Sequence, residues 1–247
     1  MVDKYLDSLE LEIKNRYKDE LVDTIYIGGG TPSSLNINQL KRLFDIIKIF
    51  KLNDNYEFTT ECNIESINSE KLKLFKINKV NRLSFGVESF NNEILKILGR
   101  YHSEELIFNN ISLSKKYFNN ISIDLIYGVN DNIDVVKSDI DKFLKLGINH
   151  VSCYSLILEE NTKLYIDNHK YIDEDIDRMM FDYIDDTLVK NGYKHYEISN
   201  YAKLGYESRH NINYWLNGSY YGFGLGAVSY LDNIKMLTKS KPYKKRL

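Results

Sequence analysis

The chain has 247 residues, a formal net charge of −2 and a hydrophobic content of 43%, and its mean hydropathy is −0.40. These values predict a soluble globular protein of one large α/β domain or two small ones. The net charge argues against bulk nucleic-acid binding. No apolar run in the sequence approaches the roughly 20 residues that span a bilayer. The two cysteines, Cys62 and Cys153, form neither a disulfide framework nor a metal motif, and no secretory signal opens the chain, so we expect a cytoplasmic location.

Segments with helical and extended patterns alternate along the chain. An opening helix is predicted by the helical spacing of Leu6, Leu9, Ile13 and Tyr17. Further helices are expected at Gln39–Phe50, Ser69–Ile77, Asn91–Leu98, Ser103–Tyr117, Asp134–Leu146 and Ile176–Asn191. Strands are expected at Thr24–Ile27, Tyr56–Thr60, Arg82–Val87, Ile121–Ile126 and His150–Leu158. This alternation predicts an α/β fold with a parallel sheet and right-handed crossovers.

Two helix ends carry capping signals. Ser33 or Ser34 is expected to cap the helix that follows the first strand. Gly192 directly follows the last long helix and is expected to end it in the left-handed conformation. The apolar side of that helix is expected to carry Met179, Met180, Tyr183, Ile184 and Leu188.

A glycine-rich turn follows the first strand. Gly28, Gly29 and Gly30 come directly after the apolar strand residues and are followed by Thr31 and Pro32. The pattern is neither a phosphate loop nor a dinucleotide-binding fingerprint, because the required lysine and the last glycine are missing. A simple tight turn would explain the glycines, but ligands of α/β folds bind at the carboxyl ends of strands. The turn is therefore a candidate site.

Three carboxylates fall at or near the ends of successive predicted strands. They are Glu61, Glu88 and Asp124. One such residue is commonly a structural ion pair, because a buried charge is costly unless it is paired. Three of them in succession, beside the glycine turn, favour a ligand site.

Five motifs occur in the order and spacing of a known family. They are Gly28-Gly29-Gly30-Thr31-Pro32, Thr60-Glu61-Cys62-Asn63, Ser84-Phe85-Gly86-Val87-Glu88-Ser89-Phe90, Leu98-Gly99-Arg100-Tyr101-His102 and Asp124-Leu125-Ile126-Tyr127-Gly128. Together they resemble the radical S-adenosylmethionine (SAM) proteins related to oxygen-independent coproporphyrinogen III oxidase. A further block from His210 to Trp215, followed by a glycine-rich segment, resembles the HemW branch of haem chaperones.

The resemblance implies a partial (β/α) TIM-like barrel that binds SAM across the carboxyl ends of its strands. The turn Gly28–Pro32 would contact the methionyl amino group through its backbone. Glu61, Glu88, Arg100 and Asp124 match positions that contact SAM in the oxidase relatives. Carboxylates suit ribose hydroxyls, and the planar donors of an arginine suit the methionyl carboxylate. Position 88 is glutamine in much of the family, so the partner of this glutamate stays open.

The sequence departs from the family at the iron–sulfur cluster. The family binds a [4Fe-4S] cluster through a Cys-x-x-x-Cys-x-x-Cys motif after the first barrel strand, and the sequence as given contains neither that strand nor the motif. Cys62 and Cys153 cannot replace it, because two thiols are too few and their spacing differs. No catalytic or metal-ligating residue is therefore assigned, and the chain is not expected to cleave SAM.

A haem or other tetrapyrrole is the second ligand that the resemblance implies. The implied contacts are His210, Asn211, Tyr214 and Trp215. Val228 stands where relatives usually carry a histidine, which weakens this prediction. An ordinary surface or hydrogen-bonding role for His210 is the alternative.

The function implied is that of a HemW-like haem chaperone, incomplete as given, that binds SAM and passes haem to an acceptor protein. Two alternatives stay open: an oxygen-independent coproporphyrinogen III oxidase, and a non-catalytic remnant. Residues 1–192 are expected to form the partial barrel without its first strand. Residues 193–247 are expected to extend it and to begin a truncated accessory region.

Overall fold

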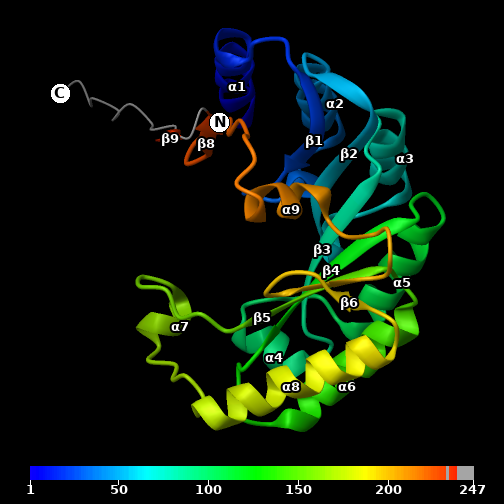
Figure 1. Cartoon of the computed structure of the whole chain (residues 1–247), viewed down its shortest axis with the longest axis vertical. Coiled ribbons are helices and arrows are strands. Elements are labelled where there is room, and N and C mark those ends of the chain that lie inside the picture. Colours follow the sequence, from blue (N-terminus) through cyan, green and yellow to red (C-terminus); the bar gives the residue numbers. More distant parts are fainter. Residues whose placement is uncertain (232–233, 238–247) are drawn as a thin grey trace. The chain divides into compact units, whose positions relative to one another are not determined.

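The computed structural model of the chain describes residues 1–231 and 234–237 (Figure 1). A seven-stranded sheet has the spatial order β1-β2-β3-β4-β5-β7-β6. Its strands are β1 (Leu21–Ile27), β2 (Lys51–Asn63), β3 (Arg82–Glu88), β4 (Asn120–Tyr127), β5 (His150–Ser155), β6 (Lys194–His195) and β7 (Asn200–Ala202). A second sheet pairs β8 (Val228–Leu231) with β9 (Ile234–Leu237).

Helices alternate with the first five strands, as the sequence pattern predicts. They are α1 (Val2–Arg16), α2 (Ile37–Ile47), α3 (Ser69–Ile77), α4 (Asn92–Ile97), α5 (Glu104–Lys115), α6 (Ile133–Leu146), α7 (Lys163–Ile166), α8 (Glu174–Lys190) and α9 (Arg209–Trp215). Short 3₁₀ turns occur at Pro32–Ser34 and Ile64–Ser66. None of the helices in the described part of the chain has the length and apolar character of a membrane span.

The described chain divides into two compact units. The first contains Met1–Ile25, Leu35–Glu57 and the described residues from Ser208 onward, and the second contains Tyr26–Ser34 and Phe58–Glu207. In the first unit, α1 packs against α2 through apolar side chains that are almost completely buried. Residues 232–233 and 238–247 of the predicted C-terminal region lie outside the described residues, and the boundary expected at 192 stays a prediction.

Within the second unit, the sheet has one polar face and one apolar face. Strands β2 to β5 run parallel, and one row of register partners joins Glu61, Ser84, Ser122 and His150. Because successive side chains of a strand point to opposite faces, this row lies on one face, which we call the polar face. The alternate residues, such as Phe85, Ile123 and Val151, are completely buried on the other face.

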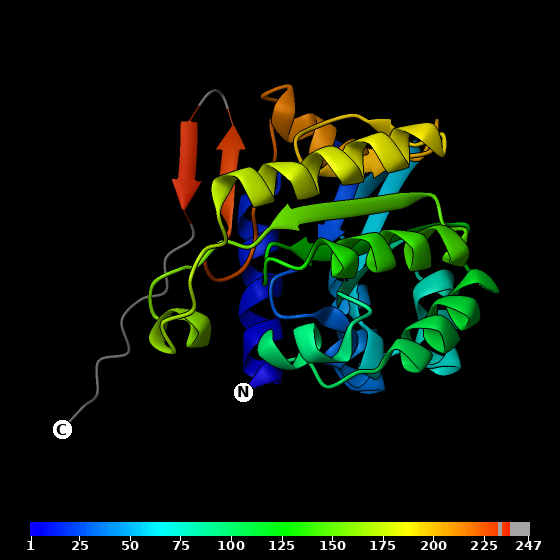
Figure 2. The same cartoon turned by 90° about the horizontal axis from the view of Figure 1, so that it is seen from below.

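Helices α6 and α8 cover the apolar face beside strand β5 (Figure 2). Ile140 of α6 and Ile184 of α8 line the same pocket as Leu125 and Cys153 of the sheet. The polar face is the one that carries the candidate ligand residues of β2, β3 and β4.

The structure corrects four expectations. Strand β5 ends at Ser155, and Leu156, which follows it, is buried in an apolar cluster with Ile94 and Val129. The sheet is not entirely parallel, because β7 pairs antiparallel with both β5 and β6. Helix α8 leaves Met179 52% exposed, whereas Met180, Ile184 and Leu188 are buried.

The fourth correction concerns the start of α2. Asn36 caps this helix, with its side chain accepting from the N–H of Gln39 in a capping box. Ser33 lies instead in the 3₁₀ turn, where its Oγ accepts a hydrogen bond from the N–H of Asn63 at 2.9 Å. Gly192 has a φ of +80°, as expected for a residue that follows a helix end.

Candidate functional site

The glycine turn after β1 is built around the carboxylate of Glu61. Tyr26 Oη donates to Glu61 Oε1 at 2.9 Å, and the N–H of Gly29 donates to Oε2 at 3.2 Å. A Cβ atom on Gly28 would lie 2.5 Å from Oε1, so no larger residue fits there without moving the carboxylate. Gly29 and Gly30 have φ of +69° and +97°, with open space beside both. The turn therefore fixes Glu61 and leaves backbone accessible to a ligand.

Thr31 and Pro32 close this turn against the end of β2. Thr31 Oγ1 donates to Asn63 Oδ1 at 3.2 Å. Pro32 is buried at the start of the 3₁₀ turn. The Thr31 hydroxyl thus links the end of the turn to the end of β2.

Glu88 and Arg100 form an ion pair at the carboxyl end of β3. Arg100 Nη2 donates to Glu88 Oε1, and the two side chains are 33% and 10% exposed. A Cβ atom on Gly86 would lie 3.0 Å from Glu88 Oε1 and 3.5 Å from Arg100 Nη2, so this glycine makes room for the pair. The other N–H groups of the partly exposed guanidinium can still donate to a planar anion.

Asp124 lies on β4, with Ser152 of β5 as its register partner. Burial raises the pKa of Asp124 to about 7, and the charges of Glu88 and Glu61 contribute to the rise. A hydrogen bond with Ser152 and the positive charge of Arg82 act in the opposite direction. Three carboxylates therefore share one electrostatic environment on the polar face. We call Gly28–Gly30, Glu61, Glu88, Arg100 and Asp124 the carboxylate site.

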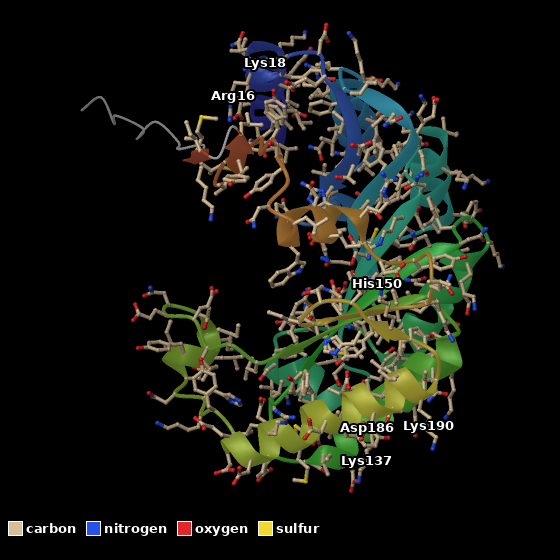
Figure 3. The ribbon with its side chains drawn as sticks, in the orientation of Figure 1. Arg16, Lys18, Lys137, His150, Asp186 and Lys190 are labelled. Atoms are coloured by element: carbon tan, nitrogen blue, oxygen red, sulfur yellow. The ribbon has the colours of Figure 1, made fainter. Side chains whose placement is uncertain are left out.

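Deeper on the polar face lie two basic residues that the sequence reasoning missed. Arg82 is 2% exposed, and its Nε has no hydrogen-bond partner in the described part of the chain. His150 is completely buried, with Nδ1 2.7 Å from Ser122 Oγ and Nε2 2.7 Å from Tyr196 Oη (Figure 3). Burial, aided by the charge of Arg82, lowers the pKa of His150 well below its usual value, so the imidazole is neutral.

The second group of predicted contacts lies on helix α9, in the first unit. His210 Nδ1 lies 2.9 Å from Thr24 Oγ1, and Nε2 lies 3.1 Å from Tyr214 Oη. The rings of His210 and Tyr214 meet edge to face at 4.9 Å, and Tyr220 extends the row at 4.5 Å from Tyr214. Aromatic rings in such a row suit a flat apolar ligand, although aromatic packing alone also produces them.

Glu57 of β2 holds the start of α9. Its carboxylate accepts from the backbone N–H of Arg209 at 3.0 Å and from that of His210 at 3.1 Å. Only 5% of Glu57 is exposed, so this contact is protected from water. Glu57 fixes His210 from a strand far away in sequence, which no local pattern indicates.

Asn211 and Trp215 do not join the contact between His210 and Tyr214. The N–H of Asn211 donates to Ser208 Oγ, the N-cap of α9, at 3.3 Å. Trp215 is 53% exposed. Of the predicted haem contacts, the structure therefore brings only His210 and Tyr214 together.

The two thiols do not fit an iron–sulfur cluster. Cys62 and Cys153 are free and buried, and burial raises the pKa of both above the usual value for cysteine. Cluster ligands are thiolates, whereas these residues are held as neutral thiols. Within residues 1–231 and 234–237, no three potential ligands among His, Cys, Asp and Glu come together as a metal site.

A profile of the Radical SAM superfamily matches residues 3–143, which include all of the carboxylate site. The chain belongs to the radical SAM superfamily. This radical SAM chain is 42% identical over 241 residues to the heme chaperone HemW of Lactococcus lactis, covering 95% of this chain and 63% of that protein. It is 39% identical over 245 residues to HemW of Bacillus subtilis, covering 95% and 65%. The radical SAM chain thus spans less than two thirds of the length of these relatives.

Among solved structures, coproporphyrinogen III oxidase (HemN) from Escherichia coli is similar to the radical SAM chain with a TM-score of 0.84. The alignment covers 97% of this chain and 60% of HemN, at 22% identity. At this identity the likeness shows the fold alone. It confirms the radical SAM type of α/β fold, and the HemW relatives confirm the resemblance drawn from the motifs.

Proposed function

We propose that this chain acts as a haem chaperone of the HemW type, binding SAM at the carboxylate site and haem at helix α9. The observation that carries the SAM proposal is the grouping of three carboxylates and a partly exposed guanidinium beside the open glycine turn. The identity of 42% to a heme chaperone supports the haem proposal.

Each part of SAM has a chemical counterpart in the carboxylate site. The strand-end backbone at Gly28–Gly30 suits the methionyl ammonium, because it lets a cation approach carbonyl oxygens closely. The N–H groups of Arg100 that do not serve Glu88 suit the methionyl carboxylate. Glu61 and Asp124 suit the ribose hydroxyls as acceptors. SAM supplies radical chemistry only where a reduced [4Fe-4S] cluster is bound, and the described residues do not fit that cluster.

Haem at α9 would use His210 as its polar contact and the ring of Tyr214 as its apolar one. The contact of Thr24 Oγ1 with Nδ1 would orient the imidazole, as hydrogen-bond partners of metal-ligating histidines do. We propose Asn211 and Trp215 as outer contacts. A haem-acceptor protein is the partner that this function requires, and a cytoplasmic location suits the two free thiols.

Coproporphyrinogen III oxidase is the second candidate, supported by the likeness in fold to HemN. The two candidates differ in what the chain does with its tetrapyrrole. A chaperone binds and releases haem unchanged, whereas an oxidase decarboxylates a porphyrinogen. The HemW identities favour the chaperone.

Two titrations test the proposal. Haem added to the purified chain should give a saturable Soret shift that is lost in His210→Ala. SAM, measured by calorimetry, should bind weakly, and Asp124→Ala should abolish that binding. Equal haem binding by the wild type and His210→Ala would overturn the haem site, and equal SAM binding by the wild type and Asp124→Ala would overturn the SAM site.

A further inference from the structure

The turn after β3 carries Glu88 in a conformation that glutamate rarely adopts. Glu88 has a φ of +65°, in the left-handed region. The next residue, Ser89, is completely buried, and its N–H donates to the carbonyl of Val87 at 2.8 Å. Ser89 Oγ also accepts from the N–H of Asn91, the N-cap of α4, at 3.0 Å. Such a backbone persists only where surrounding contacts hold it.

Asp139 supplies those contacts from helix α6, which carries no residue of the carboxylate site. Ser89 Oγ donates to Asp139 Oδ2 at 2.6 Å, and the N–H of Phe90 donates to Oδ1 at 2.9 Å. Asp139 is 7% exposed, and Phe90 is 1% exposed. Both oxygens of this buried carboxylate are therefore engaged by the turn that presents Glu88.

We propose that Asp139 is a positioning residue for SAM binding, which clamps the turn Ser89–Phe90 and so holds Glu88 and its partner Arg100 in place. This inference rests on the proposed SAM function and extends it to a residue outside the contact set. A charged acceptor binds two donors more strongly than a neutral one does. Loss of the charge should therefore loosen the turn without removing any group that touches the ligand.

The titratable groups that face Asp139 come from three elements: α5, α6 and β5. Burial raises the pKa of Asp139 to about 6, and the charge of Glu104 on α5 adds to the rise. The hydrogen bonds from the turn and the charge of Lys142 oppose it. Lys142 itself pairs with Glu104 at 2.8 Å, and Cys153 of β5 also lies within the field of Asp139. Above about pH 6 both oxygens of Asp139 accept, whereas below it one of them becomes a hydroxyl.

The test compares SAM affinity in the wild type, Asp139→Asn and the control Asp141→Asn, an exposed position on the same helix. Calorimetry with SAM is run from pH 5 to pH 8. Asp139→Asn should bind about tenfold more weakly than the wild type at pH 8. The ratio of the two dissociation constants should approach one at pH 5, because the wild-type carboxyl is then also neutral. Taking the ratio cancels the titration of Asp124, which both proteins share.

The possible outcomes separate this inference from the function on which it rests. A ratio near one at pH 8, or a ratio that stays constant across the pH range, would overturn the positioning role. Failure of the wild type and Asp141→Asn to bind SAM at any pH would overturn the proposed SAM function itself. Ser89→Ala serves as a second variant, because it removes one of the two donors and should give a smaller loss at pH 8.

Discussion

The carboxylate of Glu61 occupies the space that a side chain on Gly28 would need. A Cβ atom at position 28 would lie 2.5 Å from Glu61 Oε1 and 2.7 Å from its Cδ. We expect Gly28→Ala to displace Glu61 from Tyr26 and from the N–H of Gly29, because contacts below 3 Å are not tolerated. SAM binding should be lost, and the free energy of unfolding should fall by about 1–3 kcal/mol.

A double-mutant cycle isolates the cause of that loss. In Gly28→Ala combined with Glu61→Ala, the clashing carboxylate is absent. The double mutant should therefore lose less free energy of unfolding than the two single mutants lose in sum. Urea denaturation of the four proteins measures the coupling. Strict additivity would show that the two residues act independently and would contradict the close packing of Glu61 against Gly28.

The ion pair between Glu88 and Arg100 holds the guanidinium in position for a ligand carboxylate. Glu88→Gln keeps an acceptor but removes the charge, so Arg100 is held less firmly. We expect SAM affinity to fall by about 1 kcal/mol, or roughly fivefold. Calorimetry measures this change, with the exposed Glu93→Gln as the control. Tighter binding by Glu88→Gln would instead show that Glu88 competes with the ligand for Arg100.

Asp124 makes the chain less stable as pH rises. Its pKa is raised from 3.8 to about 7 in the folded state, so the folded protein holds this proton more tightly than the unfolded chain does. The free energy of unfolding therefore falls as the pH rises from 3.8 to about 7. Above pH 7 the ionised group costs up to about 4 kcal/mol. Asp124→Asn removes this cost. We expect it to be more stable than the wild type at pH 8, with the advantage gone near pH 4.

Urea denaturation at both pH values checks this prediction, with the exposed Asp186→Asn as the control (Figure 3). Asp124→Asn should also bind SAM poorly at pH 8. If Asp124→Asn is less stable than the wild type at pH 8, the ionised carboxylate is instead stabilised by its neighbouring groups.

The alternation of apolar strands and amphipathic helices predicted the order of elements correctly as far as β5. Strand-end position alone also identified Glu61, Glu88 and Asp124 as one group, because parallel strands end at the same edge of a sheet. The ion pair of Arg100 with Glu88 follows from neither argument, since the loop that carries Arg100 has no periodic pattern.

The polar face was missed although its signal is present in the sequence. Every second residue of β3, from Arg82 to Glu88, is polar or glycine, and the residues between them are apolar. A parallel strand buried on both faces is expected to be apolar throughout, and that expectation conceals this period of two. The contacts of Glu57 with α9 and of Thr24 with His210 could not be predicted, because they join segments more than 150 residues apart.

The hydroxyl of Tyr214 lies within hydrogen-bond distance of His210 Nε2, the ring nitrogen that would bind haem iron. Iron binding at Nε2 requires the tautomer in which Nδ1–H donates to Thr24 Oγ1, and in that tautomer the lone pair of Nε2 accepts from Tyr214 Oη at 3.1 Å. Iron ligation at Nε2 must break that hydrogen bond. Tyr214→Phe keeps the ring but removes the competitor, so haem affinity should rise by about 1 kcal/mol, or roughly fivefold.

Thr24→Val provides the opposite change at the other ring nitrogen. It keeps the shape of the side chain but removes the acceptor that fixes the tautomer, so haem should bind more weakly than to the wild type. Soret titrations of the wild type, Tyr214→Phe, Thr24→Val and the neighbouring control Tyr220→Phe measure both effects. If His210 is instead only a structural hydrogen-bonding residue, Tyr214→Phe and Thr24→Val will both lose stability, and their haem affinities will not move in opposite directions. Affinities that move in opposite directions would assign the iron to Nε2 of His210, because only that atom gains from one change and loses from the other.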